Sequence, residues 1–406
     1  MTQQYNVTVV GGGPAGAAAA ALLAQGGLRV ALVEQKAFPR QKVCGEFVST
    51  GARPVLRQLG ILEAFDSLAG PKLSRIVAFP HDGHALEASL PADGNGYFAR
   101  GMSRDLFDQL ILNAAREAGV RVIQPAYMEF VEGDAATGFT VAIRHMESIT
   151  SETVIVADGK PRTNCTSHAV EPEKQGDPPP AVRPIGYLGF KAHFSDCDLP
   201  DDVTVLAGTD GIYAGLLRTS DITGSLSEAT LDDGKKRYNL AFAAHQRLLT
   251  QWLNAEDLLN YLLAENRGLK RVMRRSIRLS KWYSCGPMVP GMRRLYNNGQ
   301  FFAGNAAGEV HALVGEGMTL ALRSGRLLAN HLLADLGSGE NLAVIGDAYE
   351  KAWKKEFTRR LGAGNLFSDL LMRPMLGSIA SDALNTFPEV LHAAVEYSGK
   401  SAGLVS

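Results

Sequence analysis

A glycine-rich hexapeptide near the start of the chain is the first group of residues whose spacing suggests chemistry. Gly11, Gly13 and Gly16 form the pattern G-x-G-x-x-G with Pro14 and Ala15 between the last two, directly after a short β-branched run. Small residues let backbone N–H groups at the positive end of a helix approach a pyrophosphate closely. This segment therefore predicts a dinucleotide-binding turn between a strand and a helix.

One acidic residue and two distant motifs extend the predicted site. Glu34 ends the next strand-like run, where a carboxylate can accept hydrogen bonds from an adenosine ribose. Asp158 ends a later strand-like run, and the G-N-A-A-G segment Gly304–Gly308 follows another. An NAD dehydrogenase needs only the first motif, whereas FAD is long enough to require a distant segment at its ribityl chain and ring. The combination favours non-covalently bound FAD.

Taken in order along the chain, these motifs resemble those of a known family. From about Tyr5 to Leu333 the sequence is similar to the geranylgeranyl reductase branch of the para-hydroxybenzoate hydroxylase-type FAD-dependent oxidoreductases. The likeness rests on Gly11–Gly16 with Glu34, on Pro39–Glu46 (P-R-Q-K-V-C-G-E), and on Ser103-Arg104, Ala157–Gly159 and Gly304–Gly317. The P-R-x-K-x-C-G-E stretch separates this branch from flavin halogenases, whose W-x-W-x-I-P signature is also absent.

The resemblance implies positions for the parts of FAD. It places Arg40 near the pyrophosphate, where a guanidinium pairs well with a dianion, and Arg104 near the ribityl or adenosine portion. It places Asp158 near both FAD and the middle strands. A long helix beginning near Gly315 would direct its positive end at the flavin and stabilise the reduced ring by about 0.3 to 2 kcal/mol. The cofactor contacts expected there are Gly304, Asn305, Gly315, Gly317 and Met318.

Departures from the family pattern bear on the substrate. Asn305 replaces the usual aspartate of G-D-A-A-G, so it can bind ribityl hydroxyls without bringing a charge, and Ala312 replaces a familiar proline. The family's pocket motif, roughly Y-x-W-x-F-P, aligns with Tyr213–Arg218, which puts Gly215 in the place of Trp. A glycine leaves room for a bulkier or differently shaped substrate than a prenyl lipid. The substrate-pocket residues expected from this alignment are Tyr213, Gly215 and Leu217.

Four further side chains are candidates for chemistry or substrate contact. His311 stands in the loop that should pass the flavin ring and could act as a general acid. Cys44 belongs to the family's C-G-E element and either lines the active site or is a small buried apolar residue. Lys191 and His193 alternate in a predicted strand and share a face, which lies either in the substrate pocket or in solvent.

The order of elements predicts an α/β fold. We expect a Rossmann-type, three-layer ββα FAD-binding domain from residues 1–75, 99–180 and 275–345, interleaved with a mixed-sheet substrate domain from 76–98 and 181–274. A helical C-terminal region would cover 346–406. Strands are expected at Tyr187–Phe194 and Val203–Leu217, helices at Asp232–Asn254, Ala255–Lys270 and Gly315–Leu336, and an exposed connection at Lys160–Arg183.

Composition and charge restrict the partners. The 41 Lys+Arg balance 42 Asp+Glu, so no overall field would attract nucleic acid. The four cysteines are scattered without metal-ligand spacing, so no metal is expected. The sequence shows neither a signal peptide nor an apolar run long enough to span a membrane, which favours a cytoplasmic monomer or homodimer, with peripheral membrane contact possible.

The family likeness implies reduction of a carbon–carbon double bond in an apolar, lipid-like or polyketide-like molecule by flavin hydride transfer. Two alternatives remain open: a monooxygenase that hydroxylates an aromatic or polyketide-like substrate through a flavin C4a-hydroperoxide, and a non-catalytic electron-transfer flavoprotein. Since the chain carries one dinucleotide motif only, the reductant is expected to be transiently docked NAD(P)H or an electron-carrier protein.

Overall fold

The computed structural model describes residues 4–80, 85–159, 186–223, 230–231, 235–251, 254–311, 315–336 and 341–372. The connection expected at Lys160–Arg183, the residue Ala312 and the last part of the helical C-terminal region lie outside these ranges. Within them, no helix has both the length and the apolar character that crossing a membrane requires.

The first sheet is built on the expected βαβ unit. Strand β1 (Gln4–Val10) leads through helix α1 (Pro14–Gln25) into β2 (Val30–Val33), and β1 pairs in parallel with both β2 and β11. The strand order is β21-β22-β11-β1-β2-β8, with β10 and β9 attached to β11 in an antiparallel ladder. The other strands are β8 (Arg121–Ile123), β9 (Met128–Asp134), β10 (Gly138–Ile143), β11 (Ile149–Val156), β21 (Tyr296–Asn297) and β22 (Gln300–Phe302).

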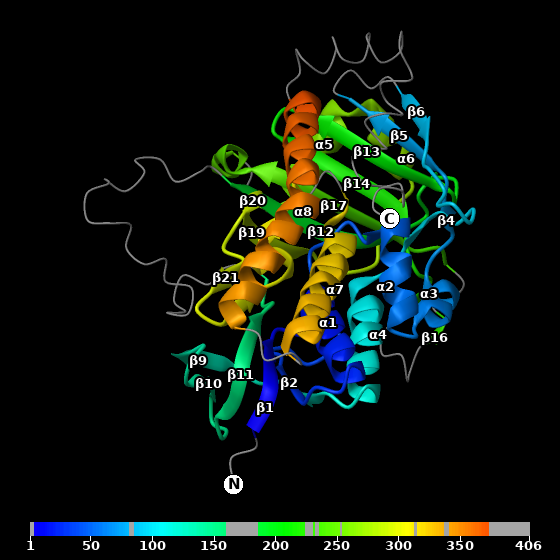
Figure 1. The fold of residues 1–406 in the computed structure, drawn as a ribbon. Helices are drawn as coiled ribbons and strands as arrows, with labels where there is room; N and C mark the ends of the chain where they lie inside the picture. The colour runs from blue at the N-terminus through cyan, green and yellow to red at the C-terminus, as the bar shows by residue number, and fades with distance from the viewer. Residues whose placement is uncertain are drawn as a thin grey trace.

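Helices gather beside β1 and β2 and complete this layer (Figure 1). They are α1, α4 (Arg104–Glu117) and α7 (Gly317–Leu336), with α8 (Leu342–Met372) packed against α7. Ser103 is the N-cap residue of α4 in extended conformation, although its side chain makes no capping hydrogen bond. Helices α1 and α7 approach closely because Gly325 has no side chain: a Cβ there would lie 2.3 Å from the carbonyl oxygen of Ala15.

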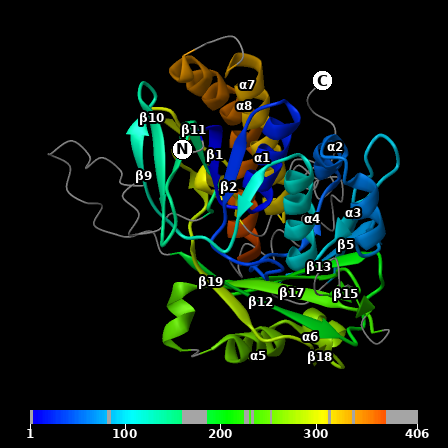
Figure 2. The ribbon, with the colours of Figure 1, turned by 90° about the horizontal axis from the view of Figure 1, so that it is seen from below.

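The second sheet lies across the end of the first layer, and helices α5 and α6 cover its far face (Figure 2). Its order is β18-β12-β17-β14-β13-β5-β6, and β19 also pairs with β12. Its strands are β5 (Arg75–Phe79), β6 (Leu86–Ser89), β12 (Tyr187–Ser195), β13 (Val203–Thr209), β14 (Ile212–Arg218), β17 (Tyr238–His245), β18 (Ile277–Arg278) and β19 (Tyr283–Met288). The α/β class with two interleaved units is thus confirmed.

The prediction of a helix at Asp232–Asn254 is wrong. The segment instead holds β17, which pairs with β12 and β14 near the middle of the sheet, followed by a 3-10 turn at Gln246–Thr250. Alanines at 241, 243 and 244 favour a helix by propensity. Because this strand is buried on both faces, its sequence lacks the polar alternation that reveals a strand, and tertiary pairing decides its conformation.

The helix expected at Ala255–Lys270 is two helices, α5 (Ala255–Glu265) and α6 (Arg267–Met273). Asn266 stands between them and is fully buried. Its side-chain amide donates to the carbonyl oxygens of Phe79 and Gly208 at 2.9 and 3.0 Å, and its side-chain oxygen accepts from the N–H of Leu269 at 2.9 Å. One residue therefore ends α5, caps α6 and ties both to the sheet.

Short elements fill the junction of the two units. The helices are α2 (Arg53–Gln58) and α3 (Leu62–Leu68), with 3-10 turns at Thr50–Ala52 and Gly304–Ala306. The strands are β3 (Phe47–Val48), β4 (Lys72–Leu73), β7 (Ala99–Gly101), β15 (Ile222–Thr223), β16 (Thr230–Leu231), β20 (Gly291–Met292) and β23 (Gly308–Glu309).

We expect Gly325→Ala to destabilise the protein by about 1 to 3 kcal/mol, because the new methyl group would overlap the backbone of α1. An ordinary glycine-to-alanine change inside a helix stabilises by up to about 1 kcal/mol, so the sign itself is diagnostic. Urea unfolding measures the change. Gly94→Ala, in an exposed loop where the methyl group meets nothing within 4 Å, is the matched control. A stabilised Gly325→Ala variant would contradict the close approach of the two helices.

Candidate functional site

The glycine-rich turn and Glu34 form one rigid cradle. Gly11 has a φ of +105°, and a Cβ there would lie 2.5 Å from the carbonyl oxygen of Ala157, so only glycine fits. The buried carboxylate of Glu34 accepts from the N–H of Gly12 at 2.7 Å and from the N–H of Lys36 at 2.8 Å. Gly13 faces Arg40, whose Nη2 would be 3.9 Å from an added Cβ. The turn and Arg40 therefore border one space.

Three cations surround this space. The guanidinium of Arg104 binds Asp108 through two hydrogen bonds of 2.8 and 2.7 Å, and Arg40 lies 3.4 Å from the same carboxylate. Lys42 lies beside them with part of its side chain exposed to solvent, and the protein atoms packed around its amino group, followed by the positive charges of Arg104 and Arg40, lower its pKa to about 8. A site that disfavours a further positive charge favours an anion. Neither Lys42 nor Asp108 was expected to contribute from the sequence.

A cavity of about 290 Å³ adjoins these cations, lined by Gly11, Glu34, Arg40, Lys42, Asp158 and neighbouring residues of β1, β2 and the 126–128 segment. Carboxylate, lysine, guanidinium and glycine backbone are the groups that an adenosine ribose and a pyrophosphate require. The residues present therefore fit the adenosine and pyrophosphate portion of FAD.

The beginning of α7 is fixed from the opposite side by Glu316. This fully buried residue accepts from the hydroxyl of Ser49 at 2.8 Å, and the same hydroxyl lies 3.0 Å from Thr319 Oγ1. Gly315 has a φ of +71° and lies against Phe47. Segments almost 270 residues apart are thus joined where the helix begins.

Among the other cofactor residues expected from the sequence, the 3-10 turn holds Gly304 and Asn305 beside Gly317, and all three line one small hollow. The N–H of Gly304 donates to Ser324 Oγ at 3.1 Å. Met318 is buried in the core, so its side chain serves packing and only its backbone is free to face a cofactor.

A buried ionic cluster lies between the two units. Glu46, which has a φ of +59° and is fully buried, pairs with the amino group of Lys191, and its other oxygen lies 3.0 Å from His193 Nε2. The N–H of Arg104 also donates to this carboxylate at 3.1 Å. Burial alone would raise the pKa of Glu46, but Lys191 and His193 outweigh burial and hold that pKa far below its usual range.

Lys191 and His193 therefore lie on neither of the two expected surfaces. Their side chains are buried, which rules out a solvated face, and they do not line the cavity described below. They share one face of β12, as alternation requires, and that face meets the Gln41–Glu46 loop: Lys191 Nζ also donates to Gln41 Oε1 at 2.7 Å.

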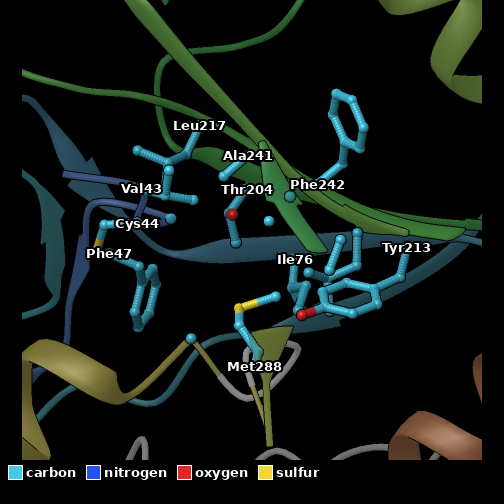
Figure 3. A pocket seen from close by; sticks show the side chains of 16 residues that line it. Val43, Cys44, Phe47, Ile76, Thr204, Tyr213, Leu217, Ala241, Phe242 and Met288 are labelled. Carbon is cyan, nitrogen blue, oxygen red and sulfur yellow. The ribbon is translucent and has the colours of Figure 1, made fainter. Parts of the chain in front are cut away.

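A second cavity, of about 100 Å³, lies between this loop and the second sheet (Figure 3). Tyr213, Gly215 and Leu217 alternate along β14 and face it together. Cys44 lines the opposite side. The remaining lining residues are Val43, Gly45, Phe47, Ile76, Gly189, Thr204, Leu206, Ala241, Phe242, Ala243, Met288 and Gly315. No charged side chain of the described residues lines this cavity.

Cys44 and His311 occupy different positions relative to this cavity. The backbone of Cys44 is held by Asn239, whose amide donates to the Cys44 carbonyl oxygen at 3.0 Å, and its Sγ lies 3.4 Å from the N–H of Glu46. His311 is buried behind the cavity wall, and its ring centroid lies 5.3 Å from that of Tyr213 and 5.4 Å from that of Tyr187. His311 thus contacts a residue that lines the cavity.

Known proteins are similar to this chain in sequence and in fold. Residues 4–171 match the family model described as "FAD binding domain". The chain is 23% identical over 402 residues to digeranylgeranylglycerophospholipid reductase 2 of Methanopyrus kandleri, covering 96% of this chain and 90% of the relative. The chain is an FAD-dependent oxidoreductase. The resemblance to the geranylgeranyl reductase branch and the expectation of FAD are confirmed.

Two other proteins that match this oxidoreductase have names that do not mention reduction. It is 24% identical over 395 residues to conditioned medium factor receptor 1 of Dictyostelium discoideum, covering 91% of this chain and 71% of that protein. Its fold matches that of the flavin-dependent brominase Bmp2 with a TM-score of 0.74 at 18% identity, covering 98% and 94% of the two chains. The fold is thus shared by flavoproteins with different reactions.

If the cations beside the glycine turn bind the pyrophosphate, the FAD affinity of the oxidoreductase should depend on pH. Lys42 without cofactor has a pKa of about 8, and a pyrophosphate beside it should raise that pKa. The protonated form therefore binds FAD more tightly, and affinity should fall by up to about tenfold per pH unit above pH 8. Fluorescence titration of the apoprotein with FAD measures this. Lys42→Met should bind more weakly at pH 7 and lose the pH dependence; an unchanged profile would place the pyrophosphate elsewhere.

Glu46→Gln should lower the free energy of unfolding at pH 7 by about 3 to 5 kcal/mol, because the buried Lys191 would lose its partner. Since folding lowers the pKa of Glu46, its contribution is complete above the ordinary carboxyl pKa of about 4.3 and is lost as the pH falls below that value. Urea unfolding of both proteins from pH 7 to about pH 3 should show a difference that is constant above about pH 5 and narrows below the ordinary carboxyl pKa. A constant difference would mean that the charge is unimportant.

Proposed function

We propose that this oxidoreductase reduces a carbon–carbon double bond of an apolar small molecule, of lipid-like or polyketide-like character. The observation that carries the proposal is the uncharged cavity between the Val43–Phe47 segment and the second sheet. Such a surface binds apolar molecules, because binding removes the apolar surfaces of both the cavity and the molecule from water. A relative that matches 96% of this chain is named digeranylgeranylglycerophospholipid reductase, and this name supports reduction as the reaction.

When bound, FAD would supply the hydride. The residues of this chain would bind the cofactor, orient the substrate and shield both from water. Glu34 would hold the adenosine ribose, and Arg40, Lys42 and Arg104 would surround the pyrophosphate. The positive end of α7 would favour negative charge on the flavin edge. Glu46 would fix the loop that carries Cys44 over the cavity.

His311 is the proposed general acid. It is buried, it stands four residues before Gly315 and six before the start of α7 at Gly317, and it packs against Tyr213 in the cavity wall. Cys44 is the second candidate, because its segment lines the cavity directly. The reductant of the flavin is proposed to be NAD(P)H docked transiently or an electron-carrier protein, and the substrate is proposed to be the only other partner.

The second candidate function is a monooxygenase acting on an aromatic or polyketide-like substrate. It is supported by the fold that this chain shares with a flavoprotein named for bromination, the flavin-dependent brominase Bmp2. The cavity of about 100 Å³ also suits a compact ring.

One experiment separates these two functions. The holoenzyme is reduced without oxygen and mixed with candidate alkenes, and a parallel sample receives ¹⁸O₂ with the same compounds. The proposal expects a product heavier by two hydrogens in the first sample and only peroxide, without ¹⁸O in the compound, in the second. Mass spectrometry reads both. A product carrying ¹⁸O, with no saturated product under anaerobic conditions, would replace reduction by oxygenation.

If His311 donates the proton, His311→Ala should slow oxidation of reduced flavin by substrate by about 10²- to 10⁴-fold, the usual contribution of a positioned acid. Flavin reduction by the external donor should remain nearly normal. Anaerobic stopped-flow absorbance separates the two half-reactions. A loss in both would indicate a disturbed cofactor, and a loss in neither would transfer the role to Cys44 or water.

Gly215→Trp should reduce substrate turnover at least tenfold without changing FAD content, because an indole would occupy the cavity at a site where only Leu206 and Val205 lie near an added Cβ, each at 3.9 Å. Steady-state kinetics with the native substrate and flavin absorbance per protein measure the two quantities. Gly45→Ala, also in the lining but with open space around the Cβ, is the control for a minor change. Unaffected turnover would remove Gly215 from the substrate site.

A further inference from the structure

Two hydroxyl groups interrupt the apolar floor of the cavity. Thr204 of β13 pairs in register with Leu217, and Tyr213 of β14 pairs with Gly208, so the two lie four positions apart along the strands. That separation corresponds to about 13 Å. Figure 3 shows both oxygens among the side chains that surround the space.

The hydroxyl of Tyr213 is suited to donate a hydrogen bond. Its side chain is buried, and burial raises its pKa well above that of an ordinary tyrosine, so it keeps its proton at any physiological pH. The ring is held from behind by His311, and from the side by Ala243 and Met288. A fixed donor that faces an apolar space is placed to meet an acceptor on the bound molecule.

The side chains of the second sheet next to Tyr213 are small. Gly215, Ala241 and Ala243 occupy neighbouring positions in the register of β14 and β17, where larger side chains would fill the space. A cavity of about 150 Å³ in another protein accommodates one benzene ring. A cavity of about 100 Å³ is smaller than that, so the part of the substrate beneath the loop is at most one small ring.

An isolated double bond is a poor hydride acceptor, whereas one conjugated to a carbonyl accepts hydride readily when the oxygen is held by a donor. We propose that the substrate is a small ring bearing an α,β-unsaturated carbonyl, whose oxygen accepts a hydrogen bond from Tyr213. The inference rests on the proposed reduction and specifies its substrate. A donor aimed where negative charge develops stabilises the transition state.

The step balances. The β-carbon accepts a hydride, which carries both electrons from the reduced FAD, and the π bond shifts to leave an enolate whose oxygen is held by Tyr213. The α-carbon then takes a proton from the general acid of the proposed function, for which Cys44 lines the cavity directly and His311 lies behind Tyr213. The product is the saturated carbonyl compound, and NAD(P)H or the carrier protein returns two electrons to FAD.

The test uses the oxidised holoenzyme and two probes of equal size, 2-cyclohexen-1-one and cyclohexene. Binding is followed by the change in flavin absorbance, and the carbonyl stretch of the bound enone by Raman difference spectroscopy. We expect the enone to bind with a lowered stretching frequency, and Tyr213→Phe to weaken its binding about tenfold and abolish the shift. The affinity for cyclohexene should be the same in wild type and in Tyr213→Phe. Tyr187→Phe, which removes a hydroxyl from the other ring that packs on His311, should leave both probes unchanged.

Equal enone affinity in wild type and Tyr213→Phe, or an unshifted carbonyl in the wild type, would overturn the inference. The proposed function fails separately: an enone that binds with the shift but is not reduced by the reduced holoenzyme would leave the Tyr213 site standing and remove reduction as its reaction.

Discussion

The carboxylate of Glu46 is the constraint on which the arrangement of this flavoenzyme depends. It is fully buried, it joins Lys191 and His193 of the second sheet, and it accepts from the backbone where α4 begins. A buried carboxylate is tolerated only when its charge is matched and its oxygens are bonded. The two units cannot separate without exposing an unpaired charge, so the Gln41–Glu46 loop is fixed between the cavity beside the glycine turn and the cavity beneath the second sheet.

The same loop gives the two sites a common wall. On one side it presents Lys42 to the cations beside the glycine turn, and on the other it presents Cys44 to the cavity. The opposite wall of the cavity leaves space for a ligand, because β14 and β17 carry the small residues Gly215, Ala241 and Ala243 there. Under the proposed function, adjacent residues of one short segment would therefore set both cofactor binding and substrate shape, and small changes there would let a shared fold support different reactions.

Sequence reasoning succeeded where the determinant is local. Gly11–Gly16 and Glu34 act within one βαβ unit, and a short family motif aligned with Tyr213–Arg218 named Tyr213, Gly215 and Leu217, which line the cavity. It failed where partners are distant: Lys191 and His193 lie 145 and 147 residues from Glu46, and nothing in their spacing names that carboxylate. It also misassigned β17, because burial on both faces removed the alternation.

The coupling between Glu46 and Lys191 tests this account most directly. Urea unfolding of wild type, Glu46→Gln, Lys191→Met and the double variant gives their interaction free energy at pH 7. We predict that each single change is strongly destabilising and that the double variant is more stable than the sum of the two losses by at least about 2 kcal/mol, with FAD retained more tightly than in either single variant. Additive losses would show that the buried pair does not hold the two units together.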